Sequence, residues 1–214
     1  MKDRAVIVSG GEIRDYSFYK DYIKENDYII CADGGSIHIN NLNIDVDLFL
    51  GDFDSCDFDL TKKGKHFISS EILRFKKEKD STDTHIAVCE AIERGYKRIS
   101  IIAALGGRMD HMMANIYLLK LMEDKGVDGE IIDEKNIVKY FSKSFAVSKK
   151  EGYYISFLPL SGSVTGLTLS GLKYSLCDYT LKSGDSICIS NEFSDKEARI
   201  DFDSGEILMF LSKD

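Results

Sequence analysis

The sequence predicts an α/β domain with a mostly parallel sheet over residues 1–128, followed by an all-β sandwich over residues 129–214. In the first half, short apolar runs alternate with segments whose apolar residues recur at helical spacing, which is typical of βαβ units. From about residue 130, the chain changes to short segments rich in Ser, Thr and Gly, which favour strands joined by turns. No Pro/Ser-rich linker separates the halves, and residues 123–136 are the expected junction.

The strands of the first half are predicted from apolar runs, most of which end in Gly or Asp. They cover residues 5–10, 28–35, 47–52 and 98–107. Helical spacing of apolar residues predicts helices between and after these strands. They lie near residues 18–23, over 82–95, and over 109–119, where the amphipathic pattern is clearest.

The strands of the second half are predicted within residues 153–176 and 198–212. The latter segment contains Asp203-Ser204-Gly205 between two apolar stretches, which predicts a β-hairpin.

The composition is that of an ordinary globular protein, with 43% hydrophobic and 30% charged residues. A net charge of −8 argues against a nucleic-acid or anionic-membrane partner. Five scattered cysteines without a C-x-x-C pair indicate reduced thiols, and no segment has the length of a signal peptide or a membrane span. We therefore expect a cytoplasmic protein. The cysteines are Cys31, Cys56, Cys89, Cys177 and Cys188.

Glycines and polar residues follow the predicted strands, at the sheet edge where ligands of doubly wound proteins bind. Glycine allows backbone to approach a ligand closely, helix starts favour phosphate, and Arg108 offers donors suited to phosphate oxygens. No P-loop or dinucleotide fingerprint is present. The segments at this edge are Ser9-Gly10-Gly11, Asp33-Gly34-Gly35, residues 51–55, residues 79–83 and residues 106–110.

Aspartates at this edge predict a Mg²⁺ site, because Mg²⁺ prefers oxygen ligands and often shares them with substrate phosphates. Asp52 and Asp54 are two apart in an extended segment and can face one ion, and Asp80 and Asp83 can close the site. An acidic chain would thus hold a polyphosphate through the metal.

The four histidines show no catalytic arrangement with Ser and Asp. We expect His38 and His66 at the surface and His85 exposed on a helix. His111, next to Asp110, is expected to cap or pack at a helix start.

Six motifs, in this order, resemble those of the thiamine pyrophosphokinase family over nearly the whole chain. They are CADGGS (31–36), GDFDS (51–55), KDSTD (79–83), LGGRMDH (105–111) with Asn115, GLKYSL (171–176) and SNEF (190–193). The resemblance implies a homodimer whose α/β domain binds ATP and whose β-sandwich helps to bind thiamine. It further implies Mg²⁺-dependent transfer of the ATP pyrophosphoryl group to the thiamine hydroxyl, giving thiamine diphosphate and AMP.

The resemblance also assigns roles to residues. Asp52, Asp54 and Asp83 would hold Mg²⁺ and the reacting phosphates, with Asp80 nearby. The nucleotide side would be lined by Asp33, Gly34, Arg108 and Asp110. Thiamine would be contacted by Ser190 and Asn191, with Lys173 and Tyr174 near that pocket.

The chain departs from the family pattern at His85, where bacterial relatives more often have an acidic residue, and at Ser170, which replaces a Thr. Neither change suggests a different reaction. Two alternatives remain at this point: a pyrophosphokinase that acts on a pterin alcohol, and a thiamine or nucleotide sensor without catalysis. The sensor would not need the four aspartates together.

Overall fold

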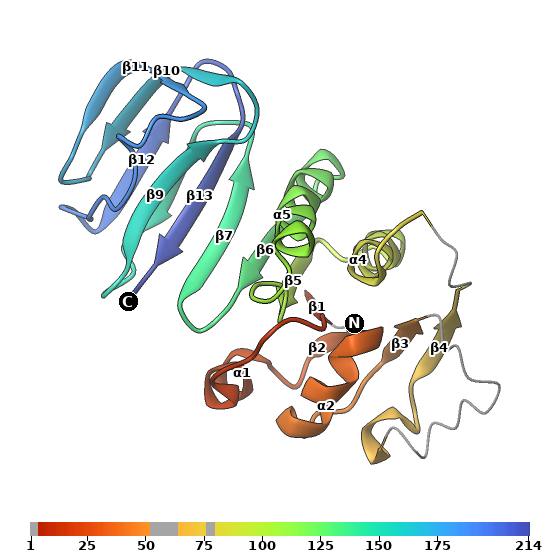
Figure 1. The fold of residues 1–214 in the computed structure, drawn as a ribbon. Coiled ribbons are helices and arrows are strands. Elements are labelled where there is room, and N and C mark those ends of the chain that lie inside the picture. The colour runs from red at the N-terminus through yellow and green to blue at the C-terminus, as the bar shows by residue number, and fades with distance from the viewer. Residues whose placement is uncertain (1–3, 52–63, 76–79) are drawn as a thin grey trace. The chain divides into compact units, whose positions relative to one another are not determined.

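The protein is described by a computed structural model that covers residues 4–51, 64–75 and 80–214. It forms two compact units, Met1–Glu134 and Lys135–Asp214. Among the described residues, no helix has the length and apolar character needed to cross a membrane. The predicted fold class is confirmed: a parallel sheet with helices comes first, and antiparallel sheets follow (Figure 1).

The first unit is built on six parallel strands in the order β4-β3-β2-β1-β5-β6. The strands are β1 (Arg4–Val8), β2 (Asp27–Ala32), β3 (Leu48–Gly51), β4 (Glu71–Arg74), β5 (Arg98–Ile102) and β6 (Asp128–Ile132). The α-helices are α1 (Tyr16–Tyr22), α2 (Ser36–Leu42), α4 (Asp83–Glu93) and α5 (Met109–Asp124), and the short 3₁₀ helices are η1 (Asp33–Gly35) and η2 (Lys65–Phe67).

The strand order reverses direction between β1 and β5. From β1 the chain moves outward through β2 and β3 to β4, then returns to the other side of β1 at β5 and continues to β6. Because such crossovers are right-handed, α1 and α2 cover one face of the sheet, and α4 and α5 cover the other (Figure 1). The reversal opens a crevice at the carboxyl ends of β1 and β5.

The central strands are nearly continuous apolar runs because both of their faces are covered. Every residue from Ala5 to Val8 and from Leu48 to Leu50 is fully buried. Only the ends of these strands therefore offer polar groups to a ligand.

The second unit consists of two antiparallel sheets, β7-β13-β9 and β11-β10-β12-β8. The ring of Phe145 from one sheet packs edge-on against the buried Phe157 of the other, with centroids 6.3 Å apart, as in a sandwich. The strands are β7 (Asn136–Phe141), β8 (Phe145–Ser148), β9 (Tyr154–Pro159), β10 (Ser163–Ser170), β11 (Leu176–Lys182), β12 (Glu197–Asp201) and β13 (Ile207–Ser212).

The predicted hairpin at Asp203-Ser204-Gly205 is wrong. β12 pairs with β8 and β10, whereas β13 pairs with β7 and β9, so the turn carries the chain from one sheet to the other. The turn is held instead by Thr165, whose N–H donates to the Ser204 carbonyl at 2.9 Å. Gly205 supplies the positive φ of 117° that the turn requires.

We expect Gly35→Ala to destabilise the first unit, because an added Cβ would lie 2.2 Å from the backbone oxygen of Val8. The φ of Gly35 is −64°, so the cost is steric, and we expect a loss of about 2 kcal/mol in unfolding free energy. Gly34→Ala is the control, because its nearest neighbour would be 3.3 Å away. Urea denaturation followed by circular dichroism measures both, and equal losses would contradict the packing argument.

Candidate functional site

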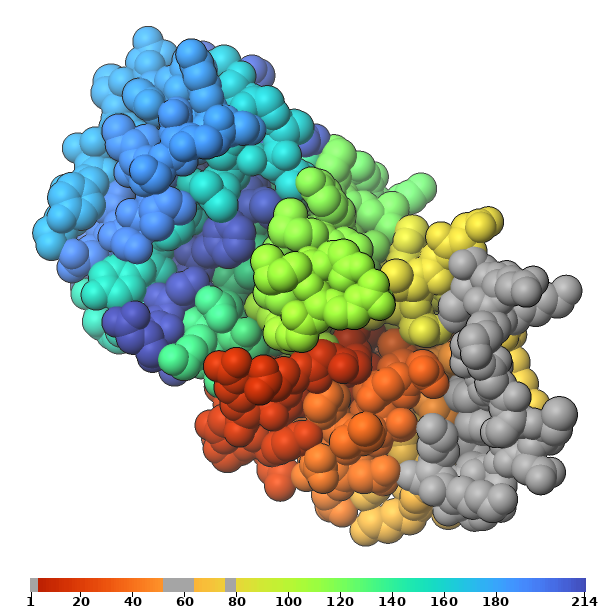
Figure 2. Space-filling model, in the orientation of Figure 1, coloured from red at the N-terminus to blue at the C-terminus, as the bar shows by residue number. Residues whose placement is uncertain are grey.

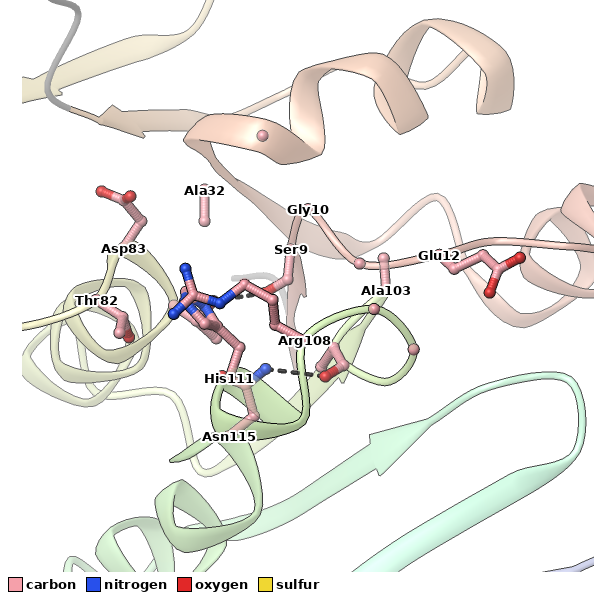
Figure 3. Close-up of a pocket in the computed structure, with 16 residues that line it drawn as sticks. Ser9, Gly10, Glu12, Ala32, Thr82, Asp83, Ala103, Arg108, His111 and Asn115 are labelled. Atoms are coloured by element: carbon pink, nitrogen blue, oxygen red, sulfur yellow. Dashed lines mark hydrogen bonds between the residues drawn. The ribbon is translucent and has the colours of Figure 1, made fainter. Parts of the chain in front are cut away.

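A cleft of about 580 Å³ lies at the carboxyl ends of β1, β2 and β5, where the strand order reverses. Its walls come from the loop after β1, the end of β2, the loop between β5 and α5, and the starts of α4 and α5 (Figure 3). This is the sheet edge at which the sequence placed the predicted site residues. The lining residues are Ser9, Gly10, Gly11, Glu12, Ala32, Gly34, Thr82, Asp83, Thr84, Ala103, Ala104, Gly106, Gly107, Arg108, His111 and Asn115.

Glycines let the loops of this cleft approach one another at backbone distance. A Cβ on Gly10 would lie 3.1 Å from the Cα of Gly34. A Cβ on Gly11 would lie 2.4 Å from the carbonyl oxygen of Ala103, which already accepts a 2.7 Å hydrogen bond from the Gly11 N–H. The loops after β1, β2 and β5 are therefore in direct backbone contact, and the cleft is left open beside them.

The loop after β5 carries local backbone strain. Ala103 is buried and adopts a φ of 51°, in the left-handed region that non-glycine residues rarely occupy. Such conformations persist where surrounding contacts enforce them. Here the carbonyl of Ala103 is held by Gly11, and the carbonyl of Ala104 accepts a 2.9 Å hydrogen bond from Nδ2 of Asn115.

The start of α5 supplies positive potential to the cleft. Arg108 is the N-cap residue of α5, and its side chain accepts no hydrogen bond from the N–H groups of this described helix, although the Asp110 carboxylate accepts from the His111 N–H. Helix starts favour anions through their free N–H groups and the helix dipole. In Figure 3, Arg108, His111 and Asn115 project from the α5 side of the cleft.

Arg108 and Asp110, both predicted on the nucleotide side, form one ion pair. The guanidinium donates from Nε to Oδ1 of Asp110 at 3.1 Å and from Nη2 to Oδ2. This hydrogen bond is the main reason that the pKa of Asp110 is lowered to about 2. The pair is exposed, so Asp110 orients the guanidinium while leaving it accessible to an anion.

The start of α4 forms the opposite wall, with Thr82 and Asp83 (Figure 3). Thr82 caps the helix by accepting from the N–H of His85 at 3.2 Å. Thr84 is joined to Ser9 by a 2.7 Å hydrogen bond between hydroxyls, which ties α4 to the end of β1. This wall places one carboxylate and two hydroxyl groups at the cleft.

The structure brings part of the predicted site together. Asp83, Gly34 and Arg108 line the cleft, and Asp33 lies at the same edge at the start of η1. Asp80 is exposed just before α4 and is not part of the lining. Asp52 and Asp54 lie outside the described residues, and among those described no group of three potential ligands is clustered.

His111 and Asn115 are cleft residues that the analysis of the sequence did not assign to the site. They lie four residues apart on α5, one turn of helix, and therefore share a face. Both residues occur in the motif LGGRMDH with Asn115, and counting four residues forward from His111 leads to Asn115, so the helical spacing was the signal that could have placed them in the cleft.

Three histidines differ from the prediction. His38 and His66, expected at the surface, are each only 8% exposed. His66 contacts the Asp45 carboxylate at 2.7 Å and the side-chain oxygen of Asn43 at 3.1 Å. Their partners lie far from them along the chain, so sequence pattern gave no sign of these hydrogen bonds. His85 is half-buried on α4.

The residues predicted to contact thiamine gather within the second unit. Asn191 is buried, and its side chain holds the backbone of Tyr174 by accepting from the N–H at 3.0 Å and donating to the carbonyl at 2.8 Å. Its Oδ1 also accepts from the N–H of Glu192 at 2.9 Å. Ser190 is exposed with a φ of 55°. The Tyr174 ring is 56% exposed, so Asn191 supports a loop that presents an aromatic face.

Comparison with known proteins identifies the family. The model for "Thiamin pyrophosphokinase, catalytic domain" matches residues 19–128, and the model for "Thiamin pyrophosphokinase, vitamin B1 binding domain" matches residues 143–207. The thiamine pyrophosphokinase of Bacillus subtilis (strain 168) is 31% identical over 213 residues, which cover 97% of this chain and 98% of that protein.

Solved structures agree with this assignment. A crystal structure of thiamine pyrophosphokinase from Bacillus subtilis superposes with a TM-score of 0.87 at 30% identity, covering 99% of both chains. One from Geobacillus thermodenitrificans gives a TM-score of 0.84 at 29% identity, covering 99% of this chain and 98% of the other. With matches to both domains and to full-length relatives, the chain belongs to the thiamine pyrophosphokinase family of enzymes.

Proposed function

We propose that this enzyme transfers the pyrophosphoryl group of ATP to the hydroxyl of thiamine, giving thiamine diphosphate and AMP in a Mg²⁺-dependent reaction. The observation that carries the proposal is the glycine-lined cleft at the strand reversal, with the start of α5 and Arg108 at one wall and Asp83 at the other. Family membership adds thiamine as the acceptor.

The cleft suits a polyphosphate in an acidic chain. Phosphates can approach the backbone of Gly10 and Gly11 closely because no side chain intervenes, and the start of α5 offers N–H groups and a positive dipole end. Arg108 adds a fork of charged donors. These groups neutralise phosphate charge where it is bound, and pyrophosphoryl transfer depends mainly on such positioning and neutralisation.

The donors at the opposite wall fit Mg²⁺, which prefers oxygen ligands. Among the described residues, the Asp83 carboxylate and the hydroxyl groups of Thr82 and Thr84 line the cleft. Asp83 would hold the ion together with Asp52 and Asp54, which follow β3 in the sequence, and Asp80 would lie nearby. When bound, Mg²⁺ supplies positive charge that orients and neutralises the reacting phosphates.

The thiamine side is assigned to the second unit. Thiamine carries a cationic ring, and the exposed face of Tyr174 is suited to a cation. Lys173, whose Nζ lies 5.5 Å from the centre of that ring, is paired with Glu192 at 2.6 Å. Ser190 and Asn191 would complete this side. Asn191 would act by holding the loop that carries Tyr174.

The experiment that tests the proposal follows AMP release from ATP. We expect AMP to form only when thiamine and Mg²⁺ are both present, with thiamine diphosphate in equal amount. Release of AMP with a pterin alcohol but not with thiamine would identify the alternative acceptor. Binding of thiamine or ATP without any AMP would identify a sensor, and either outcome would contradict the proposal.

Arg108 should act on ATP, because it lies at the α5 wall of the cleft. We expect Arg108→Ala to raise the KM for ATP about tenfold, the size of a lost charge-assisted hydrogen bond, and to leave the KM for thiamine within about twofold. Arg199→Ala is a matched control, since Arg199 is equally exposed and pairs with Asp201 in the second unit. Steady-state kinetics decide. A rise in the KM for thiamine alone would contradict the assignment of ATP to this helix.

We also propose a homodimer with active sites shared between subunits. Apolar side chains at the described surface support an interface of this kind: Met109, Met113 and Tyr117 are four residues apart on α5 and 43–69% exposed. This helix, green in Figure 2, forms part of the surface of the first unit. Ile187 and Ile189 are exposed on the second unit.

Mixing two inactive variants should restore activity if sites are shared. Asp83→Asn should lower turnover at least about a hundredfold. Asn191→Ala should inactivate by releasing the Tyr174 loop. Refolded together, half of the dimers are mixed and hold one intact site of two, so about a quarter of wild-type activity should return. Circular dichroism checks that both variants fold. The proposal of a shared site would be contradicted if the mixture were as inactive as its components, or if sedimentation showed an active monomer.

A further inference from the structure

His38 on α2 makes two hydrogen bonds with a fixed direction. Its Nε2 lies 2.7 Å from the carbonyl oxygen of Gly11, and its Nδ1 lies 2.8 Å from the hydroxyl of Tyr16. A carbonyl only accepts, so Nε2 carries the hydrogen, and Nδ1 of the neutral ring accepts from Tyr16. Burial lowers the pKa of His38, which favours this neutral form.

These two bonds are part of a longer series of hydrogen bonds that reaches the loop after β5, beside the cleft. Before His38, Nδ2 of Asn41 donates to the Tyr16 hydroxyl at 2.9 Å. After His38, the N–H of Gly11 donates to the Ala103 carbonyl at 2.7 Å. Because the Tyr16 hydroxyl accepts from Asn41, its own hydrogen is directed to His38. Both hydrogen-bonding groups of the Gly11 backbone are thus engaged: the carbonyl by the side chain of His38 on α2, and the N–H by the Ala103 carbonyl in the loop after β5.

The position of Gly11 leaves little room for adjustment. Its Cα faces the carbonyls of Ala103 and Leu105 so closely that an added Cβ would lie 2.4 and 2.8 Å from them. On its other side, the carbonyl of Gly11 is held by His38. Loss of the His38 bond would release the Gly11 carbonyl, while the Gly11 N–H would stay bound to Ala103. One of the two described anchors of Gly11 would remain, so we expect the loop of residues 9–11 to open more often.

We propose that His38 is a positioning residue of the cleft, which fixes the Gly11 peptide and through it the loop that receives the phosphates of the nucleotide. His38 is not among the described residues that line the cleft, so it acts through Gly11 alone. The role of the loop in nucleotide binding rests on the proposed function, whereas the hold on Gly11 does not.

His66 provides a matched control. It is as buried as His38 and also makes two side-chain hydrogen bonds. Its backbone carbonyl accepts from Val46, just before β3, at the amino-terminal edge of the sheet and so opposite the cleft. A general loss of packing would affect both histidines, whereas a role in the cleft would affect His38 only.

The test compares four variants by two measurements. His38→Leu removes the donor to Gly11, His38→Gln keeps an N–H near the position of Nε2, Tyr16→Phe removes only the group that orients the ring, and His66→Leu is the control. Hydrogen exchange of the loop amides is measured without nucleotide, and KM for ATP and for thiamine is measured at saturating co-substrate.

We expect the loop amides to exchange at least about tenfold faster in His38→Leu, and the KM for ATP to rise about fivefold to tenfold, as for one lost hydrogen bond. The KM for thiamine should stay within about twofold. His38→Gln should resemble wild type, and Tyr16→Phe should fall between. If His38→Leu does not fold, Tyr16→Phe alone must show both effects.

Other outcomes separate the two proposals. Unchanged loop exchange in His38→Leu and Tyr16→Phe, or equal effects in His66→Leu, would overturn the role of His38. If the loop exchanges faster in the His38 variant but the wild-type enzyme neither binds nor cleaves ATP, the two proposals separate. His38 would then still fix Gly11, and the proposed function would be wrong.

Discussion

The close approach of the loops after β1, β2 and β5 is the constraint on which the site depends. Gly10 meets Gly34 with little space to spare, and Gly11 meets Ala103 at a distance that excludes a side chain. Because β1 lies between β2 and β5, the loops after these three strands meet where the strand order reverses, and the cleft of the first unit lies beside their contact. The fully buried strands fix where each loop begins, so the packing of the core determines the geometry of the cleft.

A net charge of −8 would repel a polyphosphate unless the charge near the cleft were arranged differently. The start of α5 and Arg108 place positive potential at one wall, while Asp110 orients the guanidinium. At the other wall, the carboxylate of Asp83 would add positive charge by holding the proposed Mg²⁺. Local fields, not net charge, thus determine which ligand this surface accepts.

The fold could be predicted from sequence because its signals are local. Alternating strand and helix patterns predicted the parallel sheet, and the ends of those strands predicted the cleft. Pairing over long distances could not be predicted. The turn at Gly205 has the chemistry of a hairpin, yet its flanking strands enter different sheets. His38 was expected at the surface because its partners, Gly11 and Tyr16, lie more than 20 residues away in the sequence. That Asn191 contacts thiamine stays a prediction, whereas its hydrogen bonds to the Tyr174 backbone, 17 residues away in the sequence, could not be predicted.

The most direct test of the account is a crystal structure of the protein with Mg²⁺ and an ATP analogue that cannot transfer its pyrophosphoryl group. The account predicts phosphates against Gly10, Gly11 and the start of α5, with the guanidinium of Arg108 bound to them. It also predicts a metal ion about 2.1 Å from a carboxylate oxygen of Asp83. A nucleotide bound elsewhere while this cleft stays empty would contradict the assignment of the cleft to ATP.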